Sequence, residues 1–463
     1  MWVPPQDEHL DLLPSGLMAA KDLLSFECPV ETGFPVRGHV IIMKGNGSSG
    51  VRGFAKGSMR GGLAGRIVRL RETSTPAKFE LMGGTMSKNR LQLLHDEGQS
   101  IWLDNIDRTM LHNGDLERRI REDALTGMTS NPTIFEKALA EGVAYDDQLQ
   151  SADPGLTPGQ LFELVETTDV RDSCDLFGGV YQSTRGGDGY VSIEVSPGVA
   201  HDFRQTVDEA LRLWKTVDRP NVMVKVPGTE EGALAVRDLT SRGVNVNITL
   251  LFSLDAHARV IDAYMAGLED RVAKGEPIDG IFSVASFFVS RVDTETDKRL
   301  DAMIATAKGG DADRLRLLKG RAAIANAKLA YRLFTRRFAE PRWKALAEKG
   351  GRVQQPLWAS TSVKNPEYRD VMYAEELIGP DTVDTMPPKL IDAFRDHGNV
   401  ERSVDKRLGA SEGVLREIEA VGIPIKDVTD TLLREGLASF QKSFDSLTAG
   451  IAKKMSTLVA STK

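Results

Sequence analysis

The chain has 463 residues, of which 41% are hydrophobic and 27% charged, and its formal net charge at pH 7 is -7. This composition is typical of a globular protein and argues against general nucleic-acid binding, which needs an excess of basic residues. Cys28 and Cys174 are too few and too far apart for a disulfide framework, and no run approaches the roughly 18 apolar residues of a membrane helix, so we expect a cytoplasmic protein without membrane contact.

The first 85 residues differ from the rest of the chain. Residues 36–71 contain eight Lys or Arg, nine Gly and no Asp or Glu. Such a segment buries too little apolar surface to offset the entropy of ordering, which favours a disordered N-terminal extension over 1–85. A tail that attracts RNA or phosphate is an alternative. Another is translation from an upstream start, with Met82 or Met86 as the native first residue.

From residue 86 to 463, short β-branched runs alternate with helical patterns, which is typical of βα units around a parallel sheet. Eight strands are predicted, at 100–105, 126–132, 190–196, 221–227, 244–252, 280–288, 355–362 and 381–387. Eight such units favour an α/β fold closed into a (β/α)8 TIM barrel. Helices are predicted between the strands, at 230–242, 255–272 and, as one long helix, 311–349.

Apolar residues recur at helical spacing after the last strand, at Val428, Leu432, Leu433, Leu437, Phe440, Phe444 and Leu447. This pattern predicts additional C-terminal helices, one of which packs its apolar side on the outside of the barrel. An oligomer contact or a lid over the site are alternative roles for that helix.

Successive strand side chains point to opposite faces, so residue parity separates apolar from polar positions. In 221–227 three valines share one face, and Lys225 shares the other with Met223. Polar residues of four other strands follow the same pattern: Asp104, Thr129, Asn131, Ser192, Glu194, Asn247 and Thr249. Helical crossovers cover the Val/Ile face, so these polar side chains are expected inside the barrel, where charged groups need partners.

Lys225 is the most informative of these residues. Desolvation lowers the pKa of a lysine from about 10.4 by up to ~3–5 units, and the neutral amine is a nucleophile. Attack on a ketone forms a Schiff base, which lets the adjacent C–C bond break when an acid/base group handles the protons. Asp104 and Glu194 supply two candidate carboxylates, one of which would act through a water held by Thr249. A lysine with a purely structural partner is the alternative.

Other chemistries lack their residues. None of the seven histidines falls in a predicted strand, so a metal-dependent aldolase or hydrolase has no ligand set. No nucleotide-binding glycine motif follows a strand, and neither metal nor cofactor is expected. Ser286 and Arg291 flank the end of the sixth strand and Lys364 follows the seventh, where together they would bind a sugar phosphate.

Several motifs also resemble a known family. The segments WLDN, GMTSNPTIFEKA, YVSIEVSP, MVKVPGT, GVNVNITLLFS and SFFVSR resemble, in this order, the barrel-strand motifs of transaldolases, particularly the longer bacterial form. The resemblance runs from about residue 86 to the C-terminus. It implies a class I aldolase barrel of the non-oxidative pentose phosphate pathway that needs no cofactor. Such enzymes transfer a dihydroxyacetone unit from sedoheptulose 7-phosphate to glyceraldehyde 3-phosphate, giving erythrose 4-phosphate and fructose 6-phosphate.

The resemblance also implies residue roles. Lys225 would form the Schiff base, Asp104 would be the acid/base group, and Glu194 and Thr249 would position the catalytic water. Asn131 and Asn247, with Thr129, would bind the substrate, and Ser286 and Arg291 would bind its phosphate. The chain departs from the shorter forms at Lys364, where they carry arginine, and at Phe287, where they carry proline.

Two alternatives remain open at this point. A simple aldolase would release the enamine by protonation instead of passing it to an aldehyde. A silent barrel would only bind sugar phosphates, but it would not need to keep Lys225, Asp104 and Glu194. Sugar phosphates are the expected partners, nucleic acid and membranes are not, and the sequence leaves a homodimer open.

Overall fold

The computed structural model describes residues 88–140 and 143–461, together with the backbone of four strands nearer the N-terminus. The chain divides into two compact units, Met1–Ser87 and Lys88–Lys463. In the first unit an antiparallel sheet is formed by β1 (Leu23–Cys28), β2 (Val36–Met43), β3 (Arg52–Gly57) and β4 (Arg66–Arg69). The sequence pattern did not predict these strands. The rest of that segment lies outside the described residues, where the expected disorder over 1–85 and the dispensability of the segment stay predictions.

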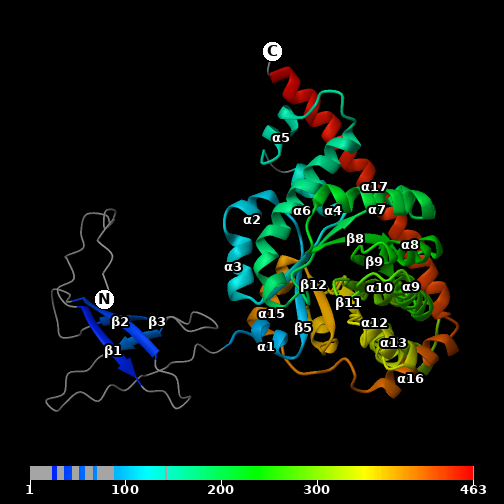
Figure 1. Cartoon of the computed structure of the whole chain (residues 1–463). Coiled ribbons are helices and arrows are strands. Elements are labelled where there is room, and N and C mark those ends of the chain that lie inside the picture. The colour runs from blue at the N-terminus through cyan, green and yellow to red at the C-terminus, as the bar shows by residue number, and fades with distance from the viewer. Residues whose placement is uncertain are drawn as a thin grey trace, which may run out of the picture. The chain divides into compact units, whose positions relative to one another are not determined.

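The second unit is built on a closed parallel barrel (Figure 1). Its strands are β5 (Gln99–Asp104), β6 (Leu125–Thr129), β7 (Val191–Glu194), β8 (Val222–Pro227), β9 (Val246–Leu251), β10 (Ser283–Phe288), β11 (Gln354–Ala359) and β12 (Thr382–Met386). Neighbours in sequence pair in parallel, and β12 pairs with β5 to close the ring. All eight predicted strands and the (β/α)8 barrel are therefore confirmed.

Helices cover the outside of the ring, as their alternation with the strands requires. They are α1 (Arg90–Asp96), α2 (Arg108–His112), α3 (Asp115–Glu122), α4 (Pro132–Ala140), α5 (Asp146–Ser151), α6 (Pro158–Ser183), α7 (Phe203–Val217), α8 (Glu230–Ser241), α9 (Leu254–Ala273), α10 (Ser290–Ile304), α14 (Met372–Glu376), α15 (Pro388–His397) and α16 (Leu408–Ala420). Side-chain caps start several of them: Asp202, Thr229 and Ser253 each accept a backbone N–H of the first turn. The predicted helices at 230–242 and 255–272 correspond to α8 and α9.

The single long helix predicted over 311–349 is wrong. The structure divides it into α11 (Gly310–Arg316), α12 (Ala322–Arg337) and α13 (Pro341–Ala347). Gly320 lies between the first two with φ +69°, a left-handed conformation that ends a helix and favours glycine. Pro341 starts α13 and holds the preceding residue in an extended conformation. The apolar spacing continued across both breaks and concealed them.

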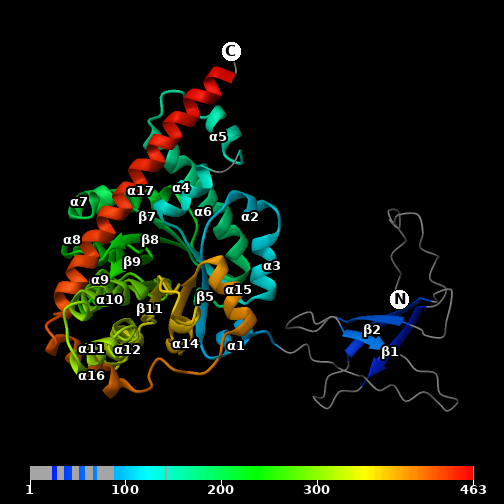
Figure 2. The ribbon, with the colours of Figure 1, turned by 180° about the vertical axis from the view of Figure 1, so that it is seen from behind.

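Helix α17 (Ile425–Ser461) is the predicted C-terminal helix, and it packs against the outside of the barrel unit as expected. Val428, Leu432, Phe440 and Leu447 are buried. Figures 1 and 2 show the helix running along one side of this unit and ending beside α5. In the part of the chain that the structure describes, no helix combines the length and apolar character that a membrane crossing requires.

Trp102 fills the barrel interior two residues before Asp104. Its indole is fully buried and donates to Asp188 Oδ1 at 2.9 Å. Gly127 on the neighbouring strand makes room for the ring, since a Cβ there would lie 2.5 Å from Trp102 Nε1. The rigid indole has no flexible end that could move aside.

Gly127→Ala is therefore expected to destabilise the barrel by about 1–3 kcal/mol, as overpacking of a dense core does. Urea denaturation followed by tryptophan fluorescence measures the change. Gly179→Ala is the matched control, because a Cβ at that helical position meets nothing within 4 Å, and it should stabilise by roughly 0.5–1 kcal/mol. Equal stability of the Gly127→Ala variant and the wild type would contradict the proposed packing.

Candidate active site

A cavity of about 1100 Å³ opens at the C-terminal ends of the barrel strands, where TIM barrels place their chemistry. Eight of the ten residues predicted for the site line it: Asp104, Thr129, Asn131, Lys225, Thr249, Ser286, Arg291 and Lys364. The remaining two, Glu194 and Asn247, lie directly behind the lining and are bonded to residues of the site or of its strands. Strand parity for seven of them, and position at the strand ends for Ser286, Arg291 and Lys364, thus selected residues that the structure brings together.

Lys225 is held by a residue of the neighbouring strand β7 and by the residue that follows β6. Its Nζ donates to Glu194 Oε2 at 2.9 Å and to the Ser130 carbonyl at 2.8 Å. Glu194, Lys225 and Asn247 are in register across β7, β8 and β9, so their side chains share the inner face. Lys225 is 5% exposed and Glu194 6%. The amine is therefore buried, fixed in position and next to a group that can take its proton.

Both carboxyl groups near the lysine bind protons more readily than usual. Burial raises the pKa of Glu194, and the charge of Lys225 and its hydrogen bond partly oppose the increase. Burial likewise raises the pKa of Asp104, against the lowering effects of Lys225, the Thr129 hydrogen bond, Arg291 and Lys364. Two acids with elevated pKa values suit proton exchange near neutral pH.

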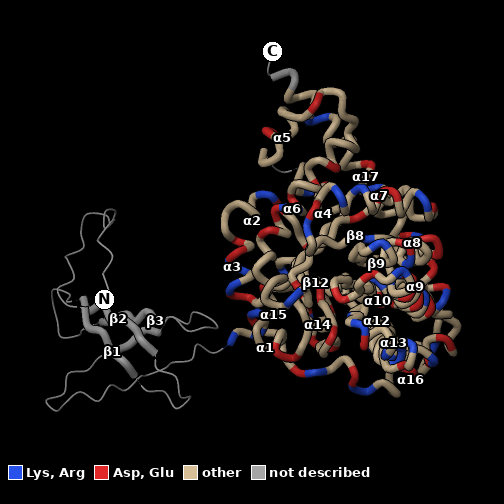
Figure 3. Tube along the Cα trace, in the orientation of Figure 1, with Lys and Arg blue, Asp and Glu red and all other residues tan. Residues whose placement is uncertain are grey.

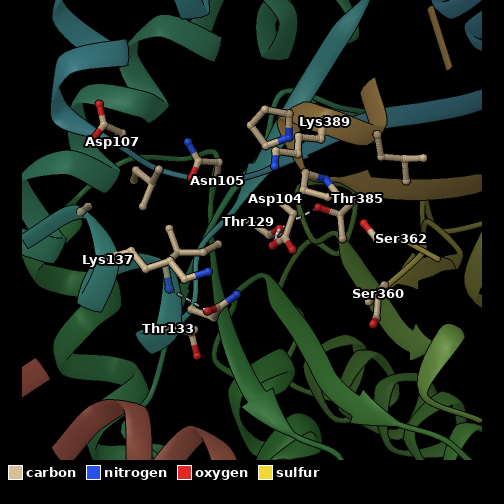
Figure 4. Close-up of a pocket in the computed structure, with 18 of the residues that line it drawn as sticks. Asp104, Asn105, Asp107, Thr129, Thr133, Lys137, Ser360, Ser362, Thr385 and Lys389 are labelled. Atoms are coloured by element: carbon tan, nitrogen blue, oxygen red, sulfur yellow. Dashed lines mark hydrogen bonds between the residues drawn. The ribbon is translucent and has the colours of Figure 1, made fainter. Parts of the chain in front are cut away.

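Asp104 is oriented by threonines (Figure 4). The Thr129 hydroxyl donates to Asp104 Oδ1 at 2.9 Å and lies 2.7 Å from the Thr385 hydroxyl. Because Thr129 donates to the carboxylate, Thr385 donates to Thr129. Thr385 was not predicted as a site residue. This chain of hydroxyl groups leaves the other Asp104 oxygen available to a bound molecule.

Thr249 presents a hydroxyl to the cavity. Its Oγ1 is buried and has no hydrogen-bond partner in the described part of the chain. The next residue, Leu250, has φ +58°, and the pairing of β9 with β10 shifts register here. A non-glycine residue held in this region stores strain, which is common at functional sites. The hydroxyl can therefore bind a water molecule or a substrate oxygen.

The two predicted asparagines are used differently. Asn131 lines the cavity, and its side-chain oxygen accepts the Ile134 N–H at the start of α4, which leaves its amide N–H groups for a ligand. Asn247 donates to Ser192 Oγ at 3.0 Å and accepts from Ser286 Oγ at 2.7 Å. Both ends of its amide are thus engaged, and it orients Ser286 from behind.

Besides Lys225, four basic side chains border the cavity: Lys137, Arg291, Lys364 and Lys389. None of these four is in an ion pair or donates a hydrogen bond to a carboxylate among the described residues, although the Arg291 guanidinium lies 5.1 Å from the Phe288 ring centre. Figure 4 shows Lys137 on α4 and Lys389 at the start of α15 beside the cavity. Unpaired cations around one cavity favour an anionic ligand.

Sequence reasoning missed part of this rim. Lys137, Lys389, Ser360 and Ser362 line the cavity but were not selected. Both serines lie at the C-terminal end of the predicted seventh strand, 355–362, so position alone could have found them. The two lysines lie on helices, where most lysines are only solvated. Phe287, the noted departure, points away from the cavity and packs against His257 and Trp358.

Comparison with known proteins finds the same family that the sequence motifs resemble. Residues 101–451 match the family model described as Transaldolase/Fructose-6-phosphate aldolase. A transaldolase of Trichodesmium erythraeum is 43% identical over 377 residues, covering 81% of this chain and 99% of that protein. Transaldolases of Saccharopolyspora erythraea and Thermobifida fusca are 45% and 46% identical, covering 80% and 79% of this chain and 98% of each relative. With the barrel, the buried lysine and these matches, the chain belongs to the transaldolase/fructose-6-phosphate aldolase family.

Proposed function

We propose that the chain is a transaldolase that transfers a dihydroxyacetone unit from sedoheptulose 7-phosphate to glyceraldehyde 3-phosphate through a Schiff base on Lys225. The observation that carries the proposal is the buried Lys225 amine, bonded to Glu194 at 2.9 Å and facing a cavity that also contains Asp104. The match to relatives named transaldolase over most of their length supports it.

Schiff-base formation begins when Glu194 takes a proton from the Lys225 ammonium group. The neutral amine then attacks the ketone carbon, and the resulting carbinolamine loses water to give the iminium ion. The raised pKa of Glu194 lets it hold this proton and return it to the departing hydroxyl. The Thr249 hydroxyl, which has no other partner among the described residues, would orient that water.

Cleavage of the C–C bond is assigned to Asp104. Its carboxylate accepts the proton of the substrate hydroxyl beyond the scissile bond, and the bond electrons move into the iminium to leave an enamine and an aldose phosphate. The aldose leaves, a second aldose phosphate binds, and Asp104 returns the proton as the new bond forms. Hydrogen bonds from Thr129 hold the carboxylate in place through both steps.

Phosphate binding is assigned to Ser286, Arg291 and Lys364, with Lys137 and Lys389 adding positive charge to the rim. Arg291 begins α10 directly after β10, whereas Lys137 lies on α4 after β6, and three strands separate β6 from β10 in either direction around the ring. The positive charges therefore surround the mouth and would attract a phosphorylated sugar from solution.

Arg291→Gln is expected to lower kcat/KM for a phosphorylated ketose by about 10- to 100-fold, because a charge-assisted hydrogen bond is worth roughly 1.5–3 kcal/mol. Steady-state kinetics with fructose 6-phosphate and with unphosphorylated fructose measure the effect, which should be confined to the phosphorylated sugar. Arg242→Gln is the control, since that arginine pairs with Asp238 on α8 outside the cavity. Equal losses with both sugars would remove Arg291 from phosphate recognition.

Product analysis separates the remaining alternatives. Sedoheptulose 7-phosphate and glyceraldehyde 3-phosphate should be converted to erythrose 4-phosphate and fructose 6-phosphate, without free dihydroxyacetone. Accumulation of dihydroxyacetone would instead identify a simple aldolase, and no turnover would favour a sugar-phosphate binder. Mass spectrometry of the quenched reaction distinguishes the three outcomes.

The cellular location, the binding partners and the oligomeric state are further parts of the proposal. The cysteine content supports a cytoplasmic location. Lys or Arg and Asp or Glu are interspersed along the described helices (Figure 3), which supports the absence of general nucleic-acid binding. The homodimer and the independence from metals stay predictions, which size-exclusion chromatography and activity in the presence of a chelator would test.

A further inference from the structure

A second buried carboxyl lies behind Glu194. Glu166 on α6 is 4% exposed, and no hydrogen bond or ion pair of its carboxyl is described. It lines a small cavity of about 40 Å³ together with Glu194, Ser196 and Glu209. This cavity is separate from the substrate cavity and lies among α6, α7 and the end of β7. A buried acid without a partner is costly in a protein interior, so its presence here calls for a role.

The small cavity has the properties of a water site. A water molecule needs roughly 10–15 Å³ of such volume and two to four polar partners, so about three molecules fit. The carboxyl groups of Glu163, Glu166, Glu194 and Glu209 and the Ser196 hydroxyl supply the partners. Glu209 is fixed in place, since it accepts the Ser196 N–H at 2.8 Å and its hydroxyl at 2.9 Å.

The small cavity also extends towards the protein surface. Its lining includes Glu163, whose side chain is 25% exposed and pairs with Arg212 at the surface, and Gly159 at the start of α6. A route therefore runs from Glu194 through the small cavity to solvent between α6 and α7, without passing through the substrate mouth.

The charges around Glu166 favour its protonated form. Burial raises its pKa well above the usual value, and the neighbouring acids Glu194, Glu163 and Glu209 raise it further, while Lys225 opposes them. The Glu166 carboxyl thus keeps its proton to higher pH than an ordinary glutamate, beside the Glu194 that pairs with Lys225. A neutral carboxyl can donate one hydrogen bond and accept another, as a proton relay requires.

We propose that Glu166 is a positioning residue that relays protons between Glu194 and solvent through the gap between α6 and α7. The inference rests on the proposed function, in which Glu194 must release any proton that it already holds before it can take one from Lys225. Protonated Glu194 gives its proton through water to one oxygen of Glu166, as Glu166 releases its own proton from the other oxygen to water in the small cavity, which passes a proton on to solvent. Glu194 thus loses one proton, solvent gains one, and Glu166 is unchanged at the end. The relay works while substrate fills the mouth and keeps water from the enamine.

The test uses the rate of Schiff-base formation. Enzyme and fructose 6-phosphate are mixed, quenched with borohydride at successive times, and the Lys225 adduct is quantified across pH 5.5–8.5. Glu166→Gln keeps the volume and a hydrogen-bond donor but cannot relay, so its rate should fall on the order of 10-fold or more. The rate should also begin to fall at a lower pH than in the wild type, because the variant no longer gains the negative charge that helps Glu194 to hold its proton as pH rises.

Two further variants distinguish proton relay by Glu166 from a purely structural role of this residue. Glu166→Leu removes the unpartnered carboxyl and is expected to fold at least as stably as the wild type yet form the adduct slowly. Glu166→Ala leaves room for a small acid, and added formate should restore its rate but not that of Glu166→Leu. Asp172→Asn is the control on the same helix, where the exposed carboxyl pairs with His112.

The outcomes are distinct. If Glu166→Gln forms the adduct at the wild-type rate and with the wild-type pH profile, the relay is overturned and the proposed function is left intact. The same result in Glu166→Leu counts in its place if Glu166→Gln does not fold. Failure of the wild type to form any adduct overturns the proposed function itself, and the relay with it.

Discussion

Lys225→Met is expected to lose essentially all turnover, a fall of at least about 10⁴-fold, because the other lysines that line the cavity, Lys137, Lys364 and Lys389, are exposed and have no carboxylate partner among the described residues to take their proton. The substitution keeps the volume of the buried side chain, and Glu194 can take a proton when its partner is gone, since burial already raises its pKa. Thermal unfolding should therefore stay close to that of the wild type. Steady-state assays with both substrates measure the loss.

Lys328→Met provides the matched control. Lys328 is also a buried lysine, 4% exposed, and its Nζ donates to a Glu376 oxygen at 2.6 Å, but it lies on α12 outside the cavity. Its replacement should lower stability without lowering the kcat of the folded protein. Comparable activity losses in the two variants, or substantial activity in Lys225→Met, would contradict covalent catalysis by Lys225.

Asp104→Ala is expected to separate the two chemical stages. The Schiff base should still form, because Glu194 remains to exchange protons with the amine, but C–C cleavage should slow by roughly 10²–10⁴-fold, the usual contribution of a general acid/base. Single-turnover experiments that follow adduct formation and aldose release separately measure both stages.

Asp293→Asn is its control. Asp293 is another buried aspartate whose pKa burial raises to about 7, but it accepts hydrogen bonds from Ala323 N and Tyr373 outside the cavity. Its replacement should leave the cleavage rate unchanged. Wild-type cleavage in Asp104→Ala would remove Asp104 from its assigned role and direct attention to Glu194, the carboxyl group bonded to Lys225.

Much of the barrel could be predicted because strand parity is a local property. Alternation placed Lys225, Glu194 and Asn247 on one face, and parallel pairing put them in register across three strands. The breaks near Gly320 and Pro341 were missed because apolar spacing persists through them. The strands β2, β3 and β4 were missed because the glycine-rich, basic composition of residues 36–71 favoured disorder.

The parts of the site that escaped prediction depend on closure of the ring. Parity shows which face a strand residue occupies, but it does not tell which helix residues meet above the strands or behind them. Lys137, Lys389 and Glu166 all lie on helices, and only the tertiary structure brings the first two to the rim and the third behind Glu194. Thr385 was not predicted because a single hydroxyl group in the last strand was the only indication of its role.

Borohydride reduction in the presence of fructose 6-phosphate, followed by peptide mapping, tests covalent catalysis most directly. The proposed mechanism predicts one stable adduct, on the peptide that contains Lys225, and none when either the sugar or the borohydride is omitted. Labelling of a different lysine, or no labelling in an active preparation, would contradict it.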